Sequence, residues 1–114
     1  MLENLSFIKD VASKRQTYYV YESDTEYILM AANWNKNNSY NLSVVPKEAT
    51  EHIRRIFKGK RVTVADVLNQ SHKPVYIKSS FDALSTLYAL CATGVAKIDH
   101  RFKGKALYFT IQRK

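Results

Sequence analysis

The sequence predicts a mixed α+β protein that forms a single domain over residues 1–114. Three observations predict this class. Residues 17–46 hold short runs rich in Tyr, Val and Leu, residues 46–94 hold apolar positions at helical spacing, and the overall composition is that of a folded chain. The chain is 46 % hydrophobic with two prolines and three glycines, so it can form a core. We expect a helix and a β-meander over 1–45, followed by a helical part with a terminal hairpin over 46–114.

The N-terminal part is expected to start with a short amphipathic helix at about 4–15, because Leu5, Ile8, Val11 and Ala12 recur at helical spacing. The period then changes to two. Three β-prone runs follow, "TYYVYES" (17–23), "EYILMAAN" (26–33) and "SYNLSVVP" (39–46), joined by polar links. Short turn-forming links favour an antiparallel meander of three strands.

A helix is predicted over about 46–58, with Pro46 as its first residue, Glu48 near its positive end and Gly59 at its C-terminus. Its apolar face is formed by Ala49, Ile53, Ile56 and Phe57. A second, shorter helix follows, for which Thr63 is the expected N-cap. Asp66 stands three residues later, as in a weak form of the capping box.

The third predicted helix has Ser79 or Ser80 as its N-cap, and Gly94 stops it. Its apolar positions recur at helical spacing and are Phe81, Leu84, Leu87, Tyr88 and Cys91. Two strands, "VAKIDHRF" and "KALYFTIQ", then form a hairpin around Lys103-Gly104.

The net charge of +8 is unevenly distributed. Residues 1–57 carry seven basic and seven acidic side chains and sum to zero, so the whole excess lies in residues 58–114. This asymmetry indicates a polyanionic partner that contacts the C-terminal half.

The order helix, short helix, longer helix and basic hairpin resembles the winged helix-turn-helix family of DNA-binding domains. The segments that carry the resemblance are "VTVADVLN", "FDALSTLYALCATG", the turn "GVAKI" and the hairpin "HRFKGKALYFTI". It covers residues 46–112 and is a resemblance of pattern. It implies a duplex DNA-binding protein, such as a small transcription regulator, with the third helix in the major groove and the hairpin, or wing, on the backbone.

The resemblance also implies a set of DNA contacts. On the hairpin, the expected phosphate contacts are Lys97, His100, Arg101, Lys103, Lys105 and Arg113. The third helix is expected to expose Ser80, Asp82, Ser85, Thr86 and Ala89, with Lys78 just before it; Lys78, Ser80, Ser85 and Thr86 are the predicted contacts. Asp82 would repel phosphate unless it caps its own helix or accepts from a cytosine amino group. Because this helix lacks outward Arg, Asn or Gln, backbone-dominated binding stays open as an alternative.

Two other functions are compatible with the sequence. A winged helix can serve as a protein-interaction module within a larger complex. The N-terminal aromatic side chains could instead stack single-stranded bases or RNA, and these are Tyr18, Tyr19, Tyr21, Tyr27, Trp34 and Tyr40. Because the N-terminal half is electrically neutral, strand packing or a homodimer surface is the favoured interpretation of these residues.

Catalysis is not expected. Glu22, Asp24 and Glu26 fit charged turn residues, and the three histidines are scattered, so no set of nucleophile, base or metal ligands is indicated. No phosphate-binding glycine loop is present, and neither a cofactor nor a metal is predicted. The lone Cys91 cannot form an internal disulfide, and no apolar run is long enough to span a bilayer. We therefore expect a cytoplasmic protein without membrane contact.

Overall fold

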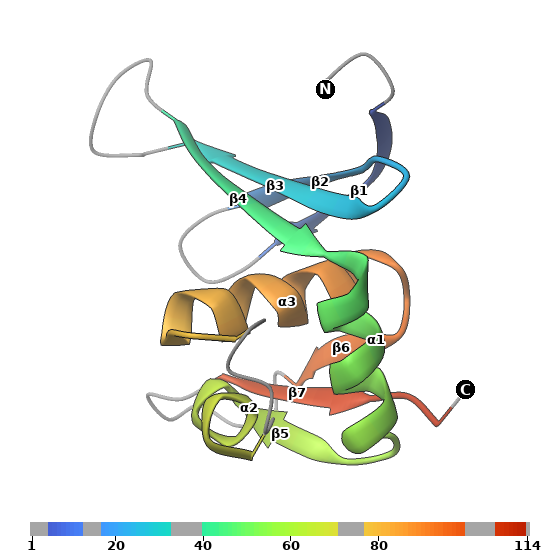
Figure 1. Ribbon diagram of the computed structural model, residues 1–114, viewed down its shortest axis with the longest axis vertical. Helices are drawn as coiled ribbons and strands as arrows, with labels where there is room; N and C mark the ends of the chain where they lie inside the picture. The colour runs from blue at the N-terminus through green and yellow to red at the C-terminus, as the bar shows by residue number, and fades with distance from the viewer. Residues whose placement is uncertain (1–4, 13–16, 33–39, 71–76, 100–106, 114) are drawn as a thin grey trace.

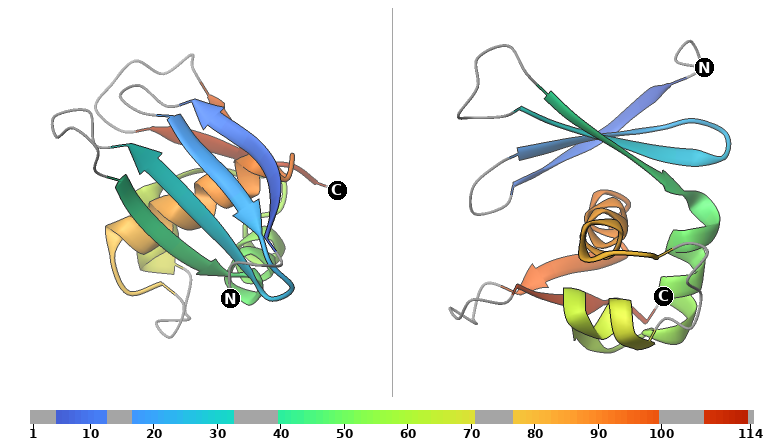
Figure 2. Two further views of the ribbon diagram at one scale, coloured as in Figure 1. Left: turned by 90° about the horizontal axis from the view of Figure 1, so that it is seen from above. Right: turned by 60° about the vertical axis from the view of Figure 1, so that its left-hand side comes forward.

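The computed structural model describes residues 5–12, 17–32, 40–70, 77–99 and 107–113. The predicted α+β class is confirmed: the described chain forms a four-stranded antiparallel sheet, a three-stranded sheet and three helices. Helix α3 (Ser80–Ala92) lies between the two sheets, with the four-stranded sheet on one side and the three-stranded sheet on the other (Figure 1). Figure 2 shows the same arrangement from two further directions.

The four-stranded sheet is an antiparallel meander in the order β1-β2-β3-β4. Its strands are β1 (Ser6–Ala12), β2 (Thr17–Glu22), β3 (Glu26–Ala32) and β4 (Tyr40–Pro46). Alternate residues face the core, among them the buried Val20, Leu29 and Val45. The opposite face carries several exposed apolar side chains, which are Phe7, Tyr19, Leu42 and Val44.

The predicted helix at 4–15 is wrong, because residues Ser6–Ala12 form strand β1, which makes the sheet four-stranded. The pairing of β1 with β2 shifts between Phe7 and Lys9, as at a β-bulge. Such a bulge inserts one residue into a strand, so Ile8 and Val11 both pack toward the core although they are three positions apart. A bulged strand therefore reproduces the helical spacing on which the prediction depended.

The middle of the chain forms α1 (Lys47–Ile56), β5 (Arg61–Thr63) and α2 (Val64–Gln70). Pro46 is the N-cap of α1 rather than its first residue. The capping box at the start of α2 is confirmed: the Thr63 N–H donates to the Asp66 carboxylate at 3.0 Å, and the Asp66 N–H donates to the Thr63 hydroxyl at 3.1 Å. Strand β5, which directly precedes this helix, was not predicted.

Of the two predicted N-caps, Ser79 is the one that caps α3, since its hydroxyl accepts from the Asp82 N–H at 3.2 Å. The helix is followed by Gly94, which has a φ of 82° that favours glycine. Strands β6 (Ala96–Asp99) and β7 (Tyr108–Ile111) then complete the three-stranded sheet, whose order is β5-β7-β6.

One apolar cluster connects both sheets through the helices. Ile53 of α1, Leu87 of α3 and Phe109 of β7 are fully buried at its centre. Within the described segments, no helix has the length and apolar character that a membrane crossing requires.

Candidate nucleic-acid interface

The three-stranded sheet has one buried face and one face that is open to solvent. Val62, Phe109 and Ala96 are buried, whereas their neighbours along the strands point to the opposite side. Arg61 pairs with Thr110, and Thr110 pairs with Lys97, so these three residues form one row across the open face. Because Arg61 and Lys97 are exposed, one cation lies on each side of the Thr110 hydroxyl.

Further cations lie beside this row because the turn after α1 is bonded to β7. The Gly59 N–H donates to the Ile111 carbonyl, and the Ile111 N–H donates to the Lys60 carbonyl, each at 2.9 Å. Gly59 has a φ of 74°, and a Cβ placed there would lie only 3.0 Å from Cγ of Arg113. The bare glycine thus lets the Arg113 side chain lie against this turn.

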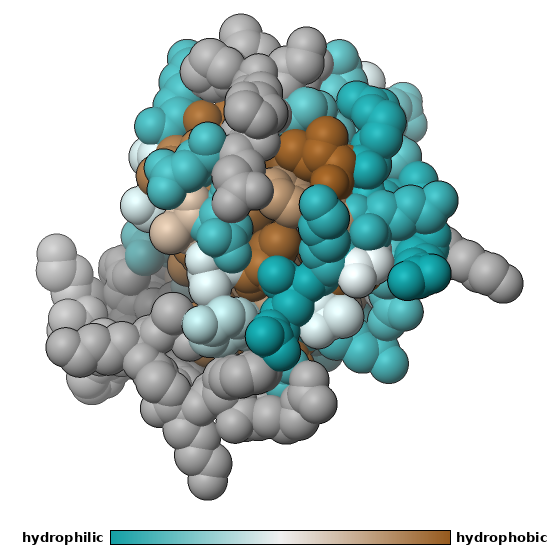
Figure 3. Space-filling view, turned by 90° about the horizontal axis from the view of Figure 1, so that it is seen from below, coloured by the Kyte–Doolittle hydropathy of each residue, from teal (hydrophilic) through white to brown (hydrophobic). Residues whose placement is uncertain are grey.

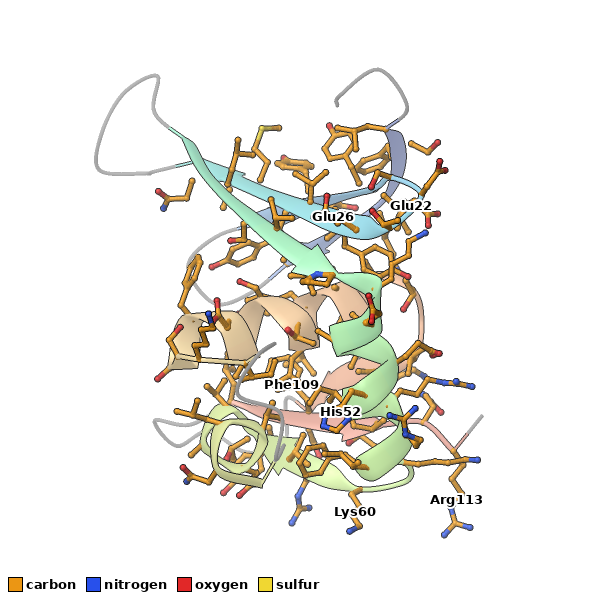
Figure 4. The ribbon with its side chains drawn as sticks, viewed as in Figure 1. Glu22, Glu26, His52, Lys60, Phe109 and Arg113 are labelled. Carbon is orange, nitrogen blue, oxygen red and sulfur yellow. The ribbon has the colours of Figure 1, made fainter. Side chains whose placement is uncertain are left out.

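We use the name basic face for the cations gathered in this way, which are Lys58, Lys60, Arg61, Lys97 and Arg113. All five are exposed. In Figure 4, Lys60 and Arg113 point away from the body of the molecule at its lower end. Hydrophilic residues also cover the right-hand part of the lower surface, on the side where α1 ends and the chain terminates (Figure 3).

Carboxylates on other parts of the molecule have partners of their own. Lys47 bonds to Glu22 at 2.8 Å, which raises the pKa of Lys47, and Arg54 lies 3.3 Å from Glu51. In the C-terminal half, Asp66 and Asp82 accept from backbone N–H groups at the starts of α2 and α3. These two carboxylates are therefore held at helix N-termini.

One carboxylate does lie on the open face of the three-stranded sheet. Asp99 pairs with Tyr108 in the row next to that of Arg61 and Lys97. The guanidinium of Arg61 lies over the Tyr108 ring, 5.5 Å from its centroid. The ring holds part of the Arg61 side chain against the sheet and leaves the charge near solvent.

Eight of the ten predicted contacts fall into three groups. Lys97 and Arg113 belong to the basic face. Lys78 and Ser80 are exposed at the start of α3, where the Lys78 N–H donates to the Asp82 carboxylate at 3.0 Å, so Asp82 caps its own helix. The remaining hairpin residues lie outside the described residues, and these are His100, Arg101, Lys103 and Lys105.

The predicted outer surface of α3 is wrong for Ser85, Thr86 and Ala89, which are only 6 %, 2 % and 0 % exposed. The physical reason is that the four-stranded sheet packs on this side of the helix (Figures 1 and 2). The Thr86 hydroxyl is satisfied within the helix, where it donates to the Asp82 carbonyl at 2.8 Å. Ser85 and Thr86 are consequently not available to a DNA groove.

The N-terminal tyrosines divide between the two faces of their sheet. Tyr18 faces inward, and its ring stacks on that of Tyr88 with 4.5 Å between centroids. Tyr27 also packs against the core, and burial raises the pKa of both Tyr18 and Tyr27. Tyr19 and Tyr21 lie on the outer face, whereas Trp34 is outside the described residues. The described aromatic rings thus do not form one continuous stacking surface.

Titratable groups that could support other chemistry are dispersed. Among the residues that the structure describes, no three His, Cys, Asp or Glu side chains come together as a metal site. Burial raises the pKa of Cys91 to about 12, which keeps its thiol protonated and unreactive at neutral pH.

Three members of the basic face were missed, namely Lys58, Lys60 and Arg61. A signal for them was present, since all three lie in the half of the chain that carries the excess charge. These three residues lie near Lys97 and Arg113 because β5 pairs with β7, and β5 was not predicted.

No protein-family model matches the chain, and comparison with curated proteins and with solved structures finds no similar protein.

Proposed function

We propose that this protein binds double-stranded DNA through the basic face, mainly by contacts with the phosphate backbone. The observation that carries the proposal is the row Arg61, Thr110 and Lys97 on the open face of the three-stranded sheet, flanked by the other exposed cations. Each phosphate that such a cation neutralises releases counterions and adds to the affinity. Because contacts with phosphate carry no sequence information, binding of this kind favours affinity over base selection.

The connectivity of the C-terminal part supports a winged-helix arrangement as part of this proposal. The described elements follow the order α1, β5, α2, α3, β6 and β7, with β7 between β5 and β6. The basic face lies on the sheet from which the wing would extend. As part of the same proposal, His100, Arg101, Lys103 and Lys105, which lie outside the described residues, supply further phosphate contacts.

The burial of α3 changes the expected mode of contact. A helix that is covered by a sheet cannot enter the major groove with the covered side. We therefore assign binding to the sheet and wing, and only the start of α3, with Lys78 and Ser80, remains as a helical contact.

The test is fluorescence anisotropy of a labelled duplex titrated with protein at several salt concentrations. Replacement of both Arg61 and Lys97 by Ala is expected to weaken binding and to lower the salt slope by roughly two. The matched control removes one Arg and one Lys of α1 that are paired with carboxylates, as Arg54→Ala with Lys47→Ala. It makes the same change in net charge and is expected to alter the slope far less.

Three outcomes of this titration would reject the proposal. They are the absence of duplex binding at low salt, equal losses in both double variants, and tighter binding of a matching single strand than of the duplex. The last result would favour base stacking on the exposed ring of Tyr19, which is 42 % exposed.

A further inference from the structure

The two edges of the four-stranded sheet differ in how well they are protected against pairing. Strand β1 carries a register shift between Phe7 and Lys9 and has charged side chains at Lys9 and Asp10. Strand β4, with the sequence "YNLSVVP", has no charged side chain and pairs with β3 in regular register along its seven residues. Bulges and charges are common protections of edge strands, so β1 is protected and β4 is not.

The backbone of β4 offers hydrogen-bonding groups on its outer side. The Lys47 N–H donates to the Thr25 carbonyl at 3.0 Å. This bond shows which residue pairs between β3 and β4 are hydrogen-bonded and which are not. Because bonded and non-bonded pairs alternate in an antiparallel ladder, Ser43 and Val45 bond to β3. The N–H and C=O groups of Leu42 and Val44 then point away from β3, where no described strand pairs with them.

Apolar side chains surround the same edge. Leu42 is 65 % exposed and Val44 is 57 % exposed, both on the outer face of the sheet. Phe81 of α3 is 53 % exposed and helps to line a groove of about 190 Å³ that runs between β4 and the first half of α3. An added strand would bury these three side chains as well as complete the backbone bonds.

We propose that β4 pairs with β4 of a second copy of this chain, antiparallel, so that two four-stranded sheets join into one continuous sheet. A second copy fits because an identical, uncharged strand meets no repulsion at this edge, although each chain carries +8. Two identical antiparallel strands are related by a two-fold axis perpendicular to the sheet, which gives a closed, self-complementary contact. The protected β1 edge prevents further addition, so the assembly stops at a dimer.

The dimer has a consequence for DNA binding, and this part of the inference rests on the proposed function. A two-fold axis perpendicular to the sheet keeps corresponding faces on the same side. Both α3 helices and both three-stranded sheets therefore lie on one side of the joined sheet. Two basic faces would be presented together to one duplex, which doubles the phosphate contacts.

Self-association is measured without DNA, so that its failure is distinct from failure of DNA binding. Sedimentation equilibrium from low to high micromolar concentration should show the wild-type mass rising from monomer to dimer. Val44→Pro removes an outward N–H but none of the bonds to β3, and a proline is tolerated at such an edge position. We expect this variant to stay monomeric with an unchanged far-ultraviolet circular dichroism spectrum.

A second variant keeps the test valid if the proline impairs folding. Leu42→Lys places a charge at the β4 edge and should also abolish the dimer. Ala12→Lys is the control, since it adds the same charge to β1 and should leave the dimer intact. Hydrogen exchange should show the amides of Leu42 and Val44 protected at high concentration only. A wild-type monomer throughout, or a dimer that persists in both folded β4 variants, would overturn the proposal. Binding of an extended peptide to a strictly monomeric chain would also overturn it.

Discussion

The ring of Tyr18 in β2 lies against the ring of Tyr88 in α3, with 4.5 Å between centroids and 27° between planes. Tyr88 in turn meets Phe109 of β7 edge-on, at 5.8 Å and 70°. A chain of three aromatic rings therefore runs from the four-stranded sheet through α3 to the three-stranded sheet. This contact connects the neutral N-terminal half to the half that carries the basic face.

Tyr88→Ala should remove the centre of this aromatic chain. Because Tyr88 is 2 % exposed, we expect the free energy of unfolding to fall by about 3–5 kcal/mol. The measurement is urea denaturation followed by circular dichroism. As a control, Tyr19→Ala removes a ring from the outer face of the same sheet and should cost about 1 kcal/mol or less. Equal losses in the two variants would show that the stacked contact has no special part in stability.

Thr86→Val tests whether α3 is withdrawn from DNA. The substitution keeps the shape of a 2 % exposed side chain and removes its bond to the Asp82 carbonyl, so unfolding should become easier by about 1 kcal/mol. Duplex affinity should not change, because this side of α3 lies beneath the four-stranded sheet. A clear loss of DNA affinity in folded Thr86→Val, comparable to that of Lys97→Ala, would restore the helix-in-groove mode.

Cys91 provides a prediction about alkaline pH. Burial raises the pKa of its thiol from 9.0 to about 12, so the unfolded chain loses this proton at lower pH than the folded chain does. The folded state then binds more protons, and stability should fall as the pH rises from about 9 toward about 12. Cys91→Ala should make the curve of unfolding free energy against pH less steep, most clearly between about pH 9 and about pH 10, below the range in which the partly buried Tyr18 and Tyr27 contribute. Iodoacetamide at about pH 9 should also modify the native thiol at least tenfold more slowly than the thiol in urea. Equal modification rates would contradict the raised pKa of Cys91.

Local signals predicted much of the fold. The meander of β2 to β4 follows from alternation and polar turns, and the capping residues Thr63, Asp66 and Ser79 act as expected. Gly94 follows α3 with a positive φ, also as its position predicts. These features succeed because each depends on residues a few positions apart, whose interactions are readable from spacing.

The failures involve contacts between distant residues. The bulge in β1 gave Ile8 and Val11 a helical spacing, and only pairing with β2 distinguishes the two structures. Similarly, the spacing of Ser85 and Thr86 indicated an outward polar face, yet the sheet formed by β1 to β4 covers them. A signal was available, since Asp82 is the single charged residue in the 13 residues of α3, and a helix with so little charge is usually buried on most sides.

The candidate site was predicted in part for the same reason. Charge counting identified the correct half of the chain and included Lys97 and Arg113. The position of Arg61 opposite Lys97 across Thr110 required the register of β5 and β6 against β7. Three-residue strands such as β5 carry too few residues for alternation to be recognised.

The most direct measurement is amide chemical-shift mapping by NMR during titration of the labelled protein with a short DNA duplex. The proposal predicts that the largest shift changes among the described amides occur at residues 58–61, at Lys97 and at residues 110–113. These shift changes should become smaller as salt is added. Amides of Ser85, Thr86 and the outer face of the four-stranded sheet should be unaffected by contact. Shift changes concentrated on that outer face would contradict binding through the basic face. So would the absence of any shift change when the duplex is in excess over the protein.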